Sequence, residues 1–200
     1  MGLHQQCPQV CADHLDICTL SALRKSIGPH IKTLRLQPRA KLLQPGNVPS
    51  YLYFLNEGNV CSFKQKKARK YITSVWQSCD IILPGTFLDQ RPSAETIELL
   101  TRCKVSALSY DSIRKIIAGN IEAAGMFQIL FNKLLNDSLS MIEDLKQKTA
   151  LQRYSDFTAK YKGIEHLLPQ NQIASLLGIK PQSLSRIRKV LLMKEKLQIV

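Results

Sequence analysis

The fold of the C-terminal quarter is decided by the stretch PQNQIASLLGIKPQSLSRIRKVL, residues 169–191. It predicts a short helix over 169–178, a two-residue turn, and a second helix that starts at Pro181. Proline suits the first position of a helix because its missing N–H has no intrahelical partner there. Gly178 can adopt the left-handed backbone that ends a helix sharply. The stretch therefore predicts a helix-turn-helix.

The side chains of this stretch divide into an apolar set and a polar set. The apolar set binds the two helices together and comprises Ile173, Leu177, Ile179, Leu184 and Ile187. Ala174 is small, as a helix crossing requires. The remaining positions of the second helix form an outward face of Gln182, Ser183, Ser185, Arg186 and Lys189.

The outward face suits the major groove of double-stranded DNA. Arginine can donate two hydrogen bonds to guanine and glutamine can pair with adenine, while serine and lysine can hold phosphates. We expect bases to be read by Gln182, Ser185 and Arg186. We expect phosphates to be held by Gln170, Lys180, Ser183, Arg188 and Lys189. The alternative is a helical pair that serves as an interface for a protein partner.

The charge distribution agrees with a polyanionic partner. The 200 residues carry a formal net charge of +13. From Lys146 onward there are eleven basic and three acidic residues, so more than half of the excess lies on the last 55 residues. Basic proteins favour nucleic acids and anionic surfaces. No apolar run is long enough to span a bilayer, and we expect a cytoplasmic protein without membrane contact.

Short strand-like runs occupy the region from Ile31 to about Tyr110. They include 41–43, 51–55, 60–63, 72–76, 81–83, 96–100 and 105–108, separated by Gly, Pro and Asn. This pattern indicates an antiparallel barrel or roll. Residues 51–63, with Gly58 near the middle, are expected to form a hairpin. The basic run from Lys64 to Lys70 is interpreted as a solvated hairpin tip rather than a second DNA contact.

A helical period begins after Asp111, the expected N-cap. Apolar residues recur at three- and four-residue steps up to Leu145, and the pattern continues to Tyr161. So broad an apolar arc requires two surfaces to bury it. One is the β-region, and the second is a copy of the same helix in a homodimer. The alternative is an ordinary core helix within one domain.

These motifs together resemble the Crp/Fnr family. The resemblance rests on the helix-turn-helix, on Leu43-Gln44-Pro45-Gly46, and on Val105-Ser106-Ala107-Leu108-Ser109-Tyr110. It implies an α+β protein with an N-terminal cyclic-nucleotide-binding-type β-roll (a double-stranded β-helix or jelly roll), a long dimerisation helix and a C-terminal winged helix-turn-helix. The expected divisions are a sensor domain with N-terminal helices (1–115), a dimerisation helix (116–145) and a DNA-binding domain (146–200).

The resemblance also implies function. Similar proteins are homodimeric transcription regulators that bind palindromic sites and contact RNA polymerase. Gln182 and Arg186 match the family's base-reading positions, whereas Gln170, Lys180, Ser183 and Lys189 match positions near phosphates. Pro181 replaces another base-reading arginine, so the operator is not inferred. Few residues follow the second helix, so we expect a short or missing wing.

The sensor departs from the family pattern. The cyclic-nucleotide cassette needs a Gly-Glu pair, a short helix and an Arg followed by Ser or Thr. Ser93-Ala94 takes the Arg-Ser place, and only five residues separate Phe87 from Ser93. Asp89 adds negative charge near the phosphate position, and Arg91 is a displaced remnant. We therefore expect no cyclic AMP binding of the family type, and the effector is not predicted.

The other chemistry-bearing residues predict no enzyme. Six cysteines occur, without a CxxC pair, and are expected to be free thiols. Cys7, Cys11 and Cys18 are the alternative, as ligands of an iron–sulfur cluster, but their spacing is wider than in the oxygen-sensing relatives. The four histidines lack metal spacing. We expect no metal, no cofactor and no catalytic group.

Overall fold

The computed structural model describes residues 27–67 and 69–197. The N-terminal helices predicted before Ile27 and the cysteines Cys7, Cys11 and Cys18 lie outside the described residues. A 3-10 turn, η2 (Gly28–His30), leads into the first strand.

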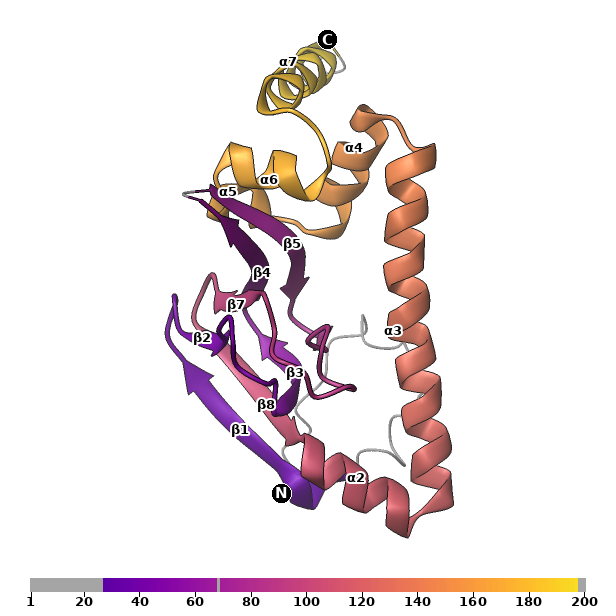
Figure 1. Ribbon diagram of the computed structural model, residues 1–200. Helices are drawn as coiled ribbons and strands as arrows, with labels where there is room; N and C mark the ends of the chain where they lie inside the picture. Colours follow the sequence, from indigo (N-terminus) through magenta and orange to yellow (C-terminus); the bar gives the residue numbers. More distant parts are fainter. Residues whose placement is uncertain (1–26, 68, 198–200) are drawn as a thin grey trace, which may run out of the picture.

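The described strands form two four-stranded antiparallel sheets that pack face to face (Figure 1). Sheet A has the order β1 (Ile31–Leu36), β8 (Cys103–Ser109), β3 (Tyr51–Glu57) and β6 (Ile81–Ile82). Sheet B has the order β2 (Lys41–Leu43), β7 (Thr96–Leu99), β4 (Asn59–Lys66) and β5 (Arg69–Gln77). Alternate side chains from both sheets meet between them, including Leu55, Val60, Ile97 and Val105. The predicted roll and each predicted strand segment are confirmed.

The predicted hairpin over residues 51–63 is wrong. β3 pairs with β6 and β8 in sheet A, whereas β4 pairs with β5 and β7 in sheet B. Gly58 is therefore a corner at which the chain changes sheets, with φ +106°. A Cβ atom at this position would lie 2.5 Å from Cys103 Sγ and 2.6 Å from the carbonyl oxygen of Arg102. A turn signal between two β-rich runs does not distinguish a hairpin from such a corner.

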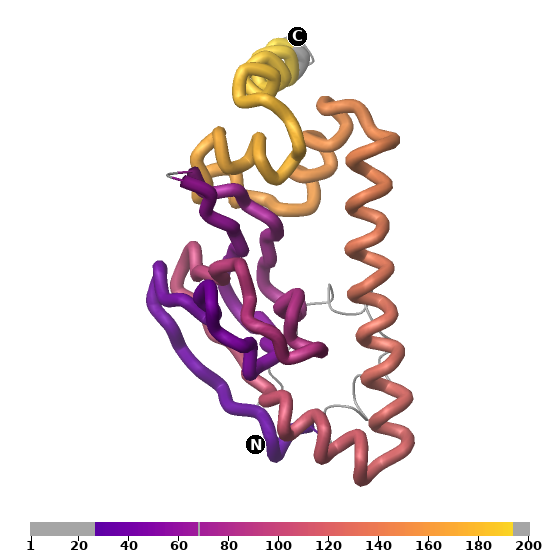
Figure 2. Tube along the Cα trace, in the orientation of Figure 1, coloured from indigo at the N-terminus to yellow at the C-terminus, as the bar shows by residue number. Residues whose placement is uncertain are grey.

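The hairpin that does form joins β4 and β5. Its register pairs Lys66 directly with Arg69, so the basic run from Lys64 to Lys70 is a hairpin tip, as predicted. The side chains at the tip are exposed to solvent. This long hairpin extends from the roll toward the C-terminal helices (Figure 2).

The predicted single helix after Asp111 is two helices, α2 (Tyr110–Gly119) and α3 (Ile121–Gln147). The N-cap of α2 is Ser109, whose hydroxyl accepts a hydrogen bond from the Ser112 amide, and Asp111 lies inside the first turn. Asn120 ends α2 in extended backbone and caps α3, because its side-chain oxygen accepts from two amides of the next turn. The Asn120 cap satisfies backbone amides that have no partner at the start of α3, which stabilises the new helix.

A second break separates α3 from α4 (Ala150–Lys160), where one continuous helical pattern was predicted. Thr149 and Gln152 form a capping box, which stabilises a new helix start. Three further helices follow, α5 (Ile164–Leu167), α6 (Gln170–Leu176) and α7 (Pro181–Leu197). None of the described helices is both long and apolar enough to cross a bilayer.

The two sheets are covered by different helices. α2 and the first half of α3 pack on sheet A through Ile113, Ile116, Phe127 and Leu130. The C-terminal helices lie at the end of sheet B, where α6 packs against β5 and α7 packs in turn on α4 and α6 (Figure 1). The roll therefore positions both the long helix and the C-terminal helices.

We expect Gly58→Ala to lower the free energy of unfolding by about 2–4 kcal/mol, because it adds left-handed strain to a close clash. Denaturant titration of the purified chain measures this change. Gly119→Ala is the matched control, since nothing lies within 4 Å of a Cβ atom there. A Gly58→Ala protein as stable as the control would contradict the corner assignment.

Candidate nucleic-acid interface

The predicted pair of helices is present as α6 and α7, joined by residues 177–180. Gly178 has φ +64°, as the prediction required. The Ile179 amide donates to the Ala174 carbonyl at 2.9 Å, and the Gly178 amide donates to the Ser175 carbonyl at 3.2 Å. This pair of bonds is a Schellman motif, which satisfies the free carbonyls at the end of α6. Pro181 is the first residue of α7, as predicted.

The apolar side of this unit is buried. Ile173, Leu177 and Leu184 are buried, and Ile179 and Ile187 pack half-buried against them. Ala174 is fully buried, in agreement with the need for a small residue at the crossing. The inward set predicted from the sequence is confirmed.

The polar side of α7 faces solvent. Gln182, Ser185, Arg186 and Lys189 are exposed, and their spacing of three and four residues places them on one helical face. Gln170 and Lys180 are also exposed, at the start of α6 and in the turn. Ser183 and Arg188 are half-buried at the edge of the face. We refer to these eight residues as the α7 face.

The α7 face is positive. No acidic residue occurs between Leu167 and Met193, whereas Lys180, Arg186, Arg188 and Lys189 are all basic. In the part of the chain that the structure describes, none of these four side chains forms an ion pair. Their charge is therefore available to an anionic partner.

The α7 face is held in place by a core shared with the roll. Cys61, Phe63, Ile72 and Val75 of sheet B belong to the same cluster as Ile173 and Leu184. A hydrogen bond of 3.0 Å from the Gln77 side chain to the Lys160 carbonyl adds a polar link between β5 and α4.

Arg153 joins α3, α4 and the turn before α7. Its Nε donates to the Leu177 carbonyl at 2.9 Å, and its Nη1 donates to the carbonyls of Leu145 at 3.3 Å and Lys148 at 2.6 Å. The planar guanidinium holds its donors on separate nitrogens in a fixed fork, whereas all three donors of a lysine lie on one nitrogen. Arg153 thus links the end of the long helix to the α6–α7 turn.

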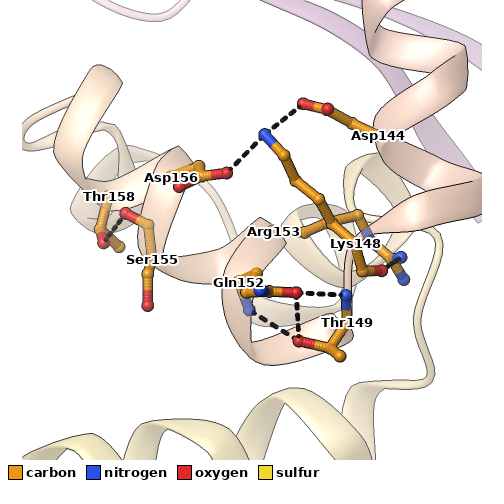
Figure 3. Close-up of polar contacts among 8 residues, drawn as sticks. All are labelled: Asp144, Lys148, Thr149, Gln152, Arg153, Ser155, Asp156 and Thr158. Atoms are coloured by element: carbon orange, nitrogen blue, oxygen red, sulfur yellow. Dashed lines mark hydrogen bonds and ion pairs between the residues drawn. The ribbon is translucent and has the colours of Figure 1, made fainter.

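Lys148 makes a second link at the same joint (Figure 3). Its ammonium lies 2.8 Å from both the Asp144 carboxylate of α3 and the Asp156 carboxylate of α4. Hydrogen bonds to these carboxylates raise the pKa of Lys148. Because the pKa of Lys148 is higher in the folded protein than in the unfolded chain, the bridge stabilises the fold at every pH below the ordinary lysine pKa. This stabilisation is lost only as the pH rises through the raised pKa of the folded protein. The bridge is therefore intact at neutral pH.

The roll segment between β6 and β7 contains turns and no helix. Ser93, which occupies the position of the family's arginine, is buried and bonded through its backbone to Gly46 and Asn47. The Glu95 carboxylate accepts from the Gly85 amide at 3.4 Å and from the Thr73 hydroxyl at 3.4 Å. Glu95 therefore places a carboxylate in the segment between β6 and β7.

Arg91 does not restore the missing positive charge. Its guanidinium pairs with the Asp89 carboxylate, and the Nε–Oδ2 distance is 2.6 Å. The arginine side chain is 76% exposed, so it points to solvent. Phe87 fixes the same segment from inside, where it is fully buried with its ring edge-on to Tyr110.

The described cysteines, Cys61, Cys79 and Cys103, are free thiols. Cys61 and Cys103 are buried, and no described group of His, Cys, Asp and Glu is arranged to hold a metal ion. Burial, assisted by the nearby Glu98, raises the pKa of Cys61 to about 12 against the effect of Lys70. Burial also raises the pKa of Cys103. Both thiols remain protonated at neutral pH.

Comparison with known proteins identifies the roll. Residues 33–120 match the family model of the cyclic nucleotide-binding domain. No curated protein matches the chain significantly. The solved structures reported below have low sequence identity to the chain, and their likeness shows a shared fold.

Three of these structures match most of the chain. A putative transcriptional regulator of the Crp/Fnr family from Eubacterium rectale is 15% identical, with a TM-score of 0.67, and the match covers 91% of this chain and 88% of that one. FixK2 from Bradyrhizobium japonicum is 16% identical, with a TM-score of 0.66 and coverages of 82% and 86%. The c-di-GMP responsive global regulator CLP from Xanthomonas campestris is 14% identical, with a TM-score of 0.63 and coverages of 88% and 93%. The chain therefore has a cyclic nucleotide-binding roll followed by helices, as in Crp/Fnr regulators.

We expect Arg153→Lys to lower the free energy of unfolding by about 2–4 kcal/mol, because one ammonium nitrogen replaces two separate donor nitrogens and does not reach all three backbone carbonyls. Denaturant titration measures the loss, and hydrogen exchange at the Gly178 and Ile179 amides reports whether the turn loosens. Arg102→Lys, at an exposed position, is the control. Equal stability of the two variants would show that the three bonds contribute nothing.

Proposed function

We propose that this protein is a transcription regulator that binds double-stranded DNA in a sequence-specific manner through a helix-turn-helix formed by α6 and α7. The observation that carries the proposal is the α7 face, which is exposed, free of acidic residues and mounted on a buried apolar core. A major groove accepts one α-helix, and its phosphates attract the flanking cations. The protein is on this proposal a binding protein and not an enzyme, located in the cytoplasm with its DNA.

The residue roles follow from position on α7. We assign base reading to Gln182, Ser185 and Arg186, which lie on the exposed face of the first turns. We assign phosphate contacts to Gln170, Lys180, Ser183, Arg188 and Lys189. Ser183 and Arg188 are half-buried, which suits contacts with the phosphates at the edge of the groove rather than with bases inside it.

The proposed assembly is a homodimer formed through α3. Beyond Leu134 the helix leaves the roll, and it exposes Leu135, Leu139, Met141, Ile142 and Leu145. With Phe131, the residues Leu135, Leu139, Ile142 and Leu145 recur at steps of three or four, as in a coiled-coil seam. A second α3 would bury this stripe and place two copies of α7 in successive major grooves of a palindromic site. Contact with RNA polymerase follows from the family resemblance alone.

We propose that the regulator does not bind cyclic AMP in the family manner. The Glu95 carboxylate and the Asp89–Arg91 pair support this, because a phosphate in the cassette would meet negative charge without a free arginine. An iron–sulfur cluster is not part of the proposal. The effector is left open.

The test is selection of binding sites from random duplexes, followed by binding of a selected duplex over a range of salt concentrations. A DNA-reading homodimer enriches a palindrome, and its affinity falls steeply as salt rises. The competing function is a protein-interaction module, which the exposed Val190, Leu192 and Met193 of α7 favour. Weak duplex binding at low salt without enrichment would support that module and overturn the proposal.

Arg186→Ala and Lys189→Ala separate the two kinds of contact. We expect Arg186→Ala to reduce discrimination between selected and scrambled duplexes by about 1–3 kcal/mol, the value of one bidentate base contact. We expect Lys189→Ala to weaken both duplexes equally and to reduce the salt slope by about one. Fluorescence anisotropy measures both effects. Equal behaviour of the two variants would refute the division of roles.

Ile142→Glu tests the α3 interface. A charge in the centre of the exposed stripe opposes burial, so we expect a monomer in sedimentation experiments and much weaker binding to a palindrome. Ser140→Glu introduces the same charge on the opposite side of α3 and is expected to leave the dimer intact. If the Ile142→Glu protein remains dimeric, the interface lies elsewhere.

A further inference from the structure

The tip of the β4–β5 hairpin is the most basic short segment of the described roll. Five of the seven residues from 64 to 70 are cations and none is acidic. We refer to Lys64, Lys66, Lys67, Arg69 and Lys70 as the basic tip. All five are exposed.

The structure leaves most of this charge unneutralised. Lys70 lies 3.8 Å from the Glu98 carboxylate and 4.1 Å from the centre of the Phe63 ring. Among the described residues, the other four cations of the basic tip have no ion-pair partner. The tip therefore presents about four uncompensated charges on one short loop.

The conformation of the basic tip destabilises the protein in the absence of a partner. Lys66 and Arg69 are directly opposite one another in the ladder, and like charges in this position repel. Lys67 adopts φ +56°, a left-handed backbone that lysine adopts only at a cost. Exposed side chains at a turn have little packing to offset either effect. A polyanion that binds the tip would remove the repulsion.

The basic tip is also fixed relative to the α7 face. Phe63 and Ile72, at the base of the tip, are buried in the cluster that contains Ile173 and Leu184. The hairpin ends beside α5 and α6, at the same end of the molecule as α7, whereas α2 lies at the opposite end (Figures 1 and 2). The basic tip therefore lies at the end of the molecule that carries α7.

We propose that the basic tip binds the phosphate backbone of double-stranded DNA that flanks the sequence read by α7. This inference rests on the proposed function and adds a second, sequence-independent contact from the roll. Phosphate contacts need charge and little shape, which a lysine-rich loop provides. A duplex bent toward the protein brings its flanks to this end of the roll, and the added contacts offset the cost of bending.

The experiment compares two triple variants of the full chain. The tip variant is Lys66→Ala, Lys67→Ala and Arg69→Ala, with Lys70 retained because it contacts Phe63 and Glu98. The control variant is Lys32→Ala, Arg114→Ala and Lys115→Ala, which removes the same charge from exposed positions on β1 and α2. Thermal unfolding without DNA checks the fold, and relief of repulsion predicts that the tip variant melts no lower than wild type.

Each protein is titrated with two duplexes that carry the same selected site. One has about 22 base pairs, enough for two half-sites a helical turn apart, and the other has about 50 base pairs with flanks on both sides. We expect the tip variant to bind the long duplex about tenfold more weakly than wild type at moderate salt, and the short duplex equally well. We expect its salt slope to fall by about 0.9 for each phosphate that the tip no longer neutralises. The control variant should keep the full preference for the long duplex.

The outcomes separate this inference from the proposed function. If wild type binds neither duplex, the proposed function fails and the flank contact fails with it. If wild type binds both duplexes and the tip variant matches it on both, the flank contact alone is wrong, and the cations belong to a protein partner or to solvent. A tip variant weakened equally on both duplexes would also overturn the flank assignment.

Discussion

The arrangement of this protein depends on one shared core, in which sheet B and the C-terminal helices bury the same side chains. α5, α6 and α7 are too few and too short to enclose an apolar centre of their own. Ile173, Leu177 and Leu184 are buried because Phe63 and Ile72 of the β4–β5 hairpin close the layer beneath them. α7 packs on α4 and α6, and α6 packs on β5, so the roll supports α7 through these helices.

A second constraint acts at the joint between α3 and α4. The chain breaks its helix at Lys148 and Thr149, and Arg153 spans the break to reach the turn before α7. A displacement of the end of α3 must either carry the α6–α7 turn with it or break bonds to three carbonyls. β5 of the roll also packs against α6, so the C-terminal helices contact both the roll and the end of α3. A displacement of β5 or of the end of α3 would therefore shift elements that contact α7 or the turn before it.

The sequence predicted the α6–α7 unit well because its signals are local. Gly178, Pro181 and the apolar spacing each constrain neighbouring residues, and no distant contact is needed to interpret them. The broken helices were missed although local signals existed: Gly119-Asn120 is a stop followed by a cap, and Thr149 with Gln152 is a capping box. A strong apolar period concealed both, because periodicity continues across a short break.

Other features could not be predicted from one-dimensional patterns. Gly58 marks a corner rather than a hairpin because β3 and β4 find partners that are distant in sequence. The position of Glu95 beside Gly85 and Thr73 depends equally on tertiary packing. The sequence indicated negative charge in this segment through Asp89, but it did not predict the hydrogen bonds of the Glu95 carboxylate. Sites assembled from separate strands require coordinates, whereas sites on one helix do not.

The two halves of α3 differ in what covers them. The first half buries Phe127 and Leu130 against the roll, while the second half leaves its apolar stripe in solvent. Leu145 belongs to that stripe, and its Cδ2 atom lies only 3.1 Å from where a Cβ atom on Gly178 would be. Its carbonyl also accepts a hydrogen bond from Arg153. A partner helix that covers the stripe therefore presses on a residue already in contact with the α6–α7 turn. If two chains pair through this stripe as proposed, dimer formation and the orientation of α7 are coupled through Leu145.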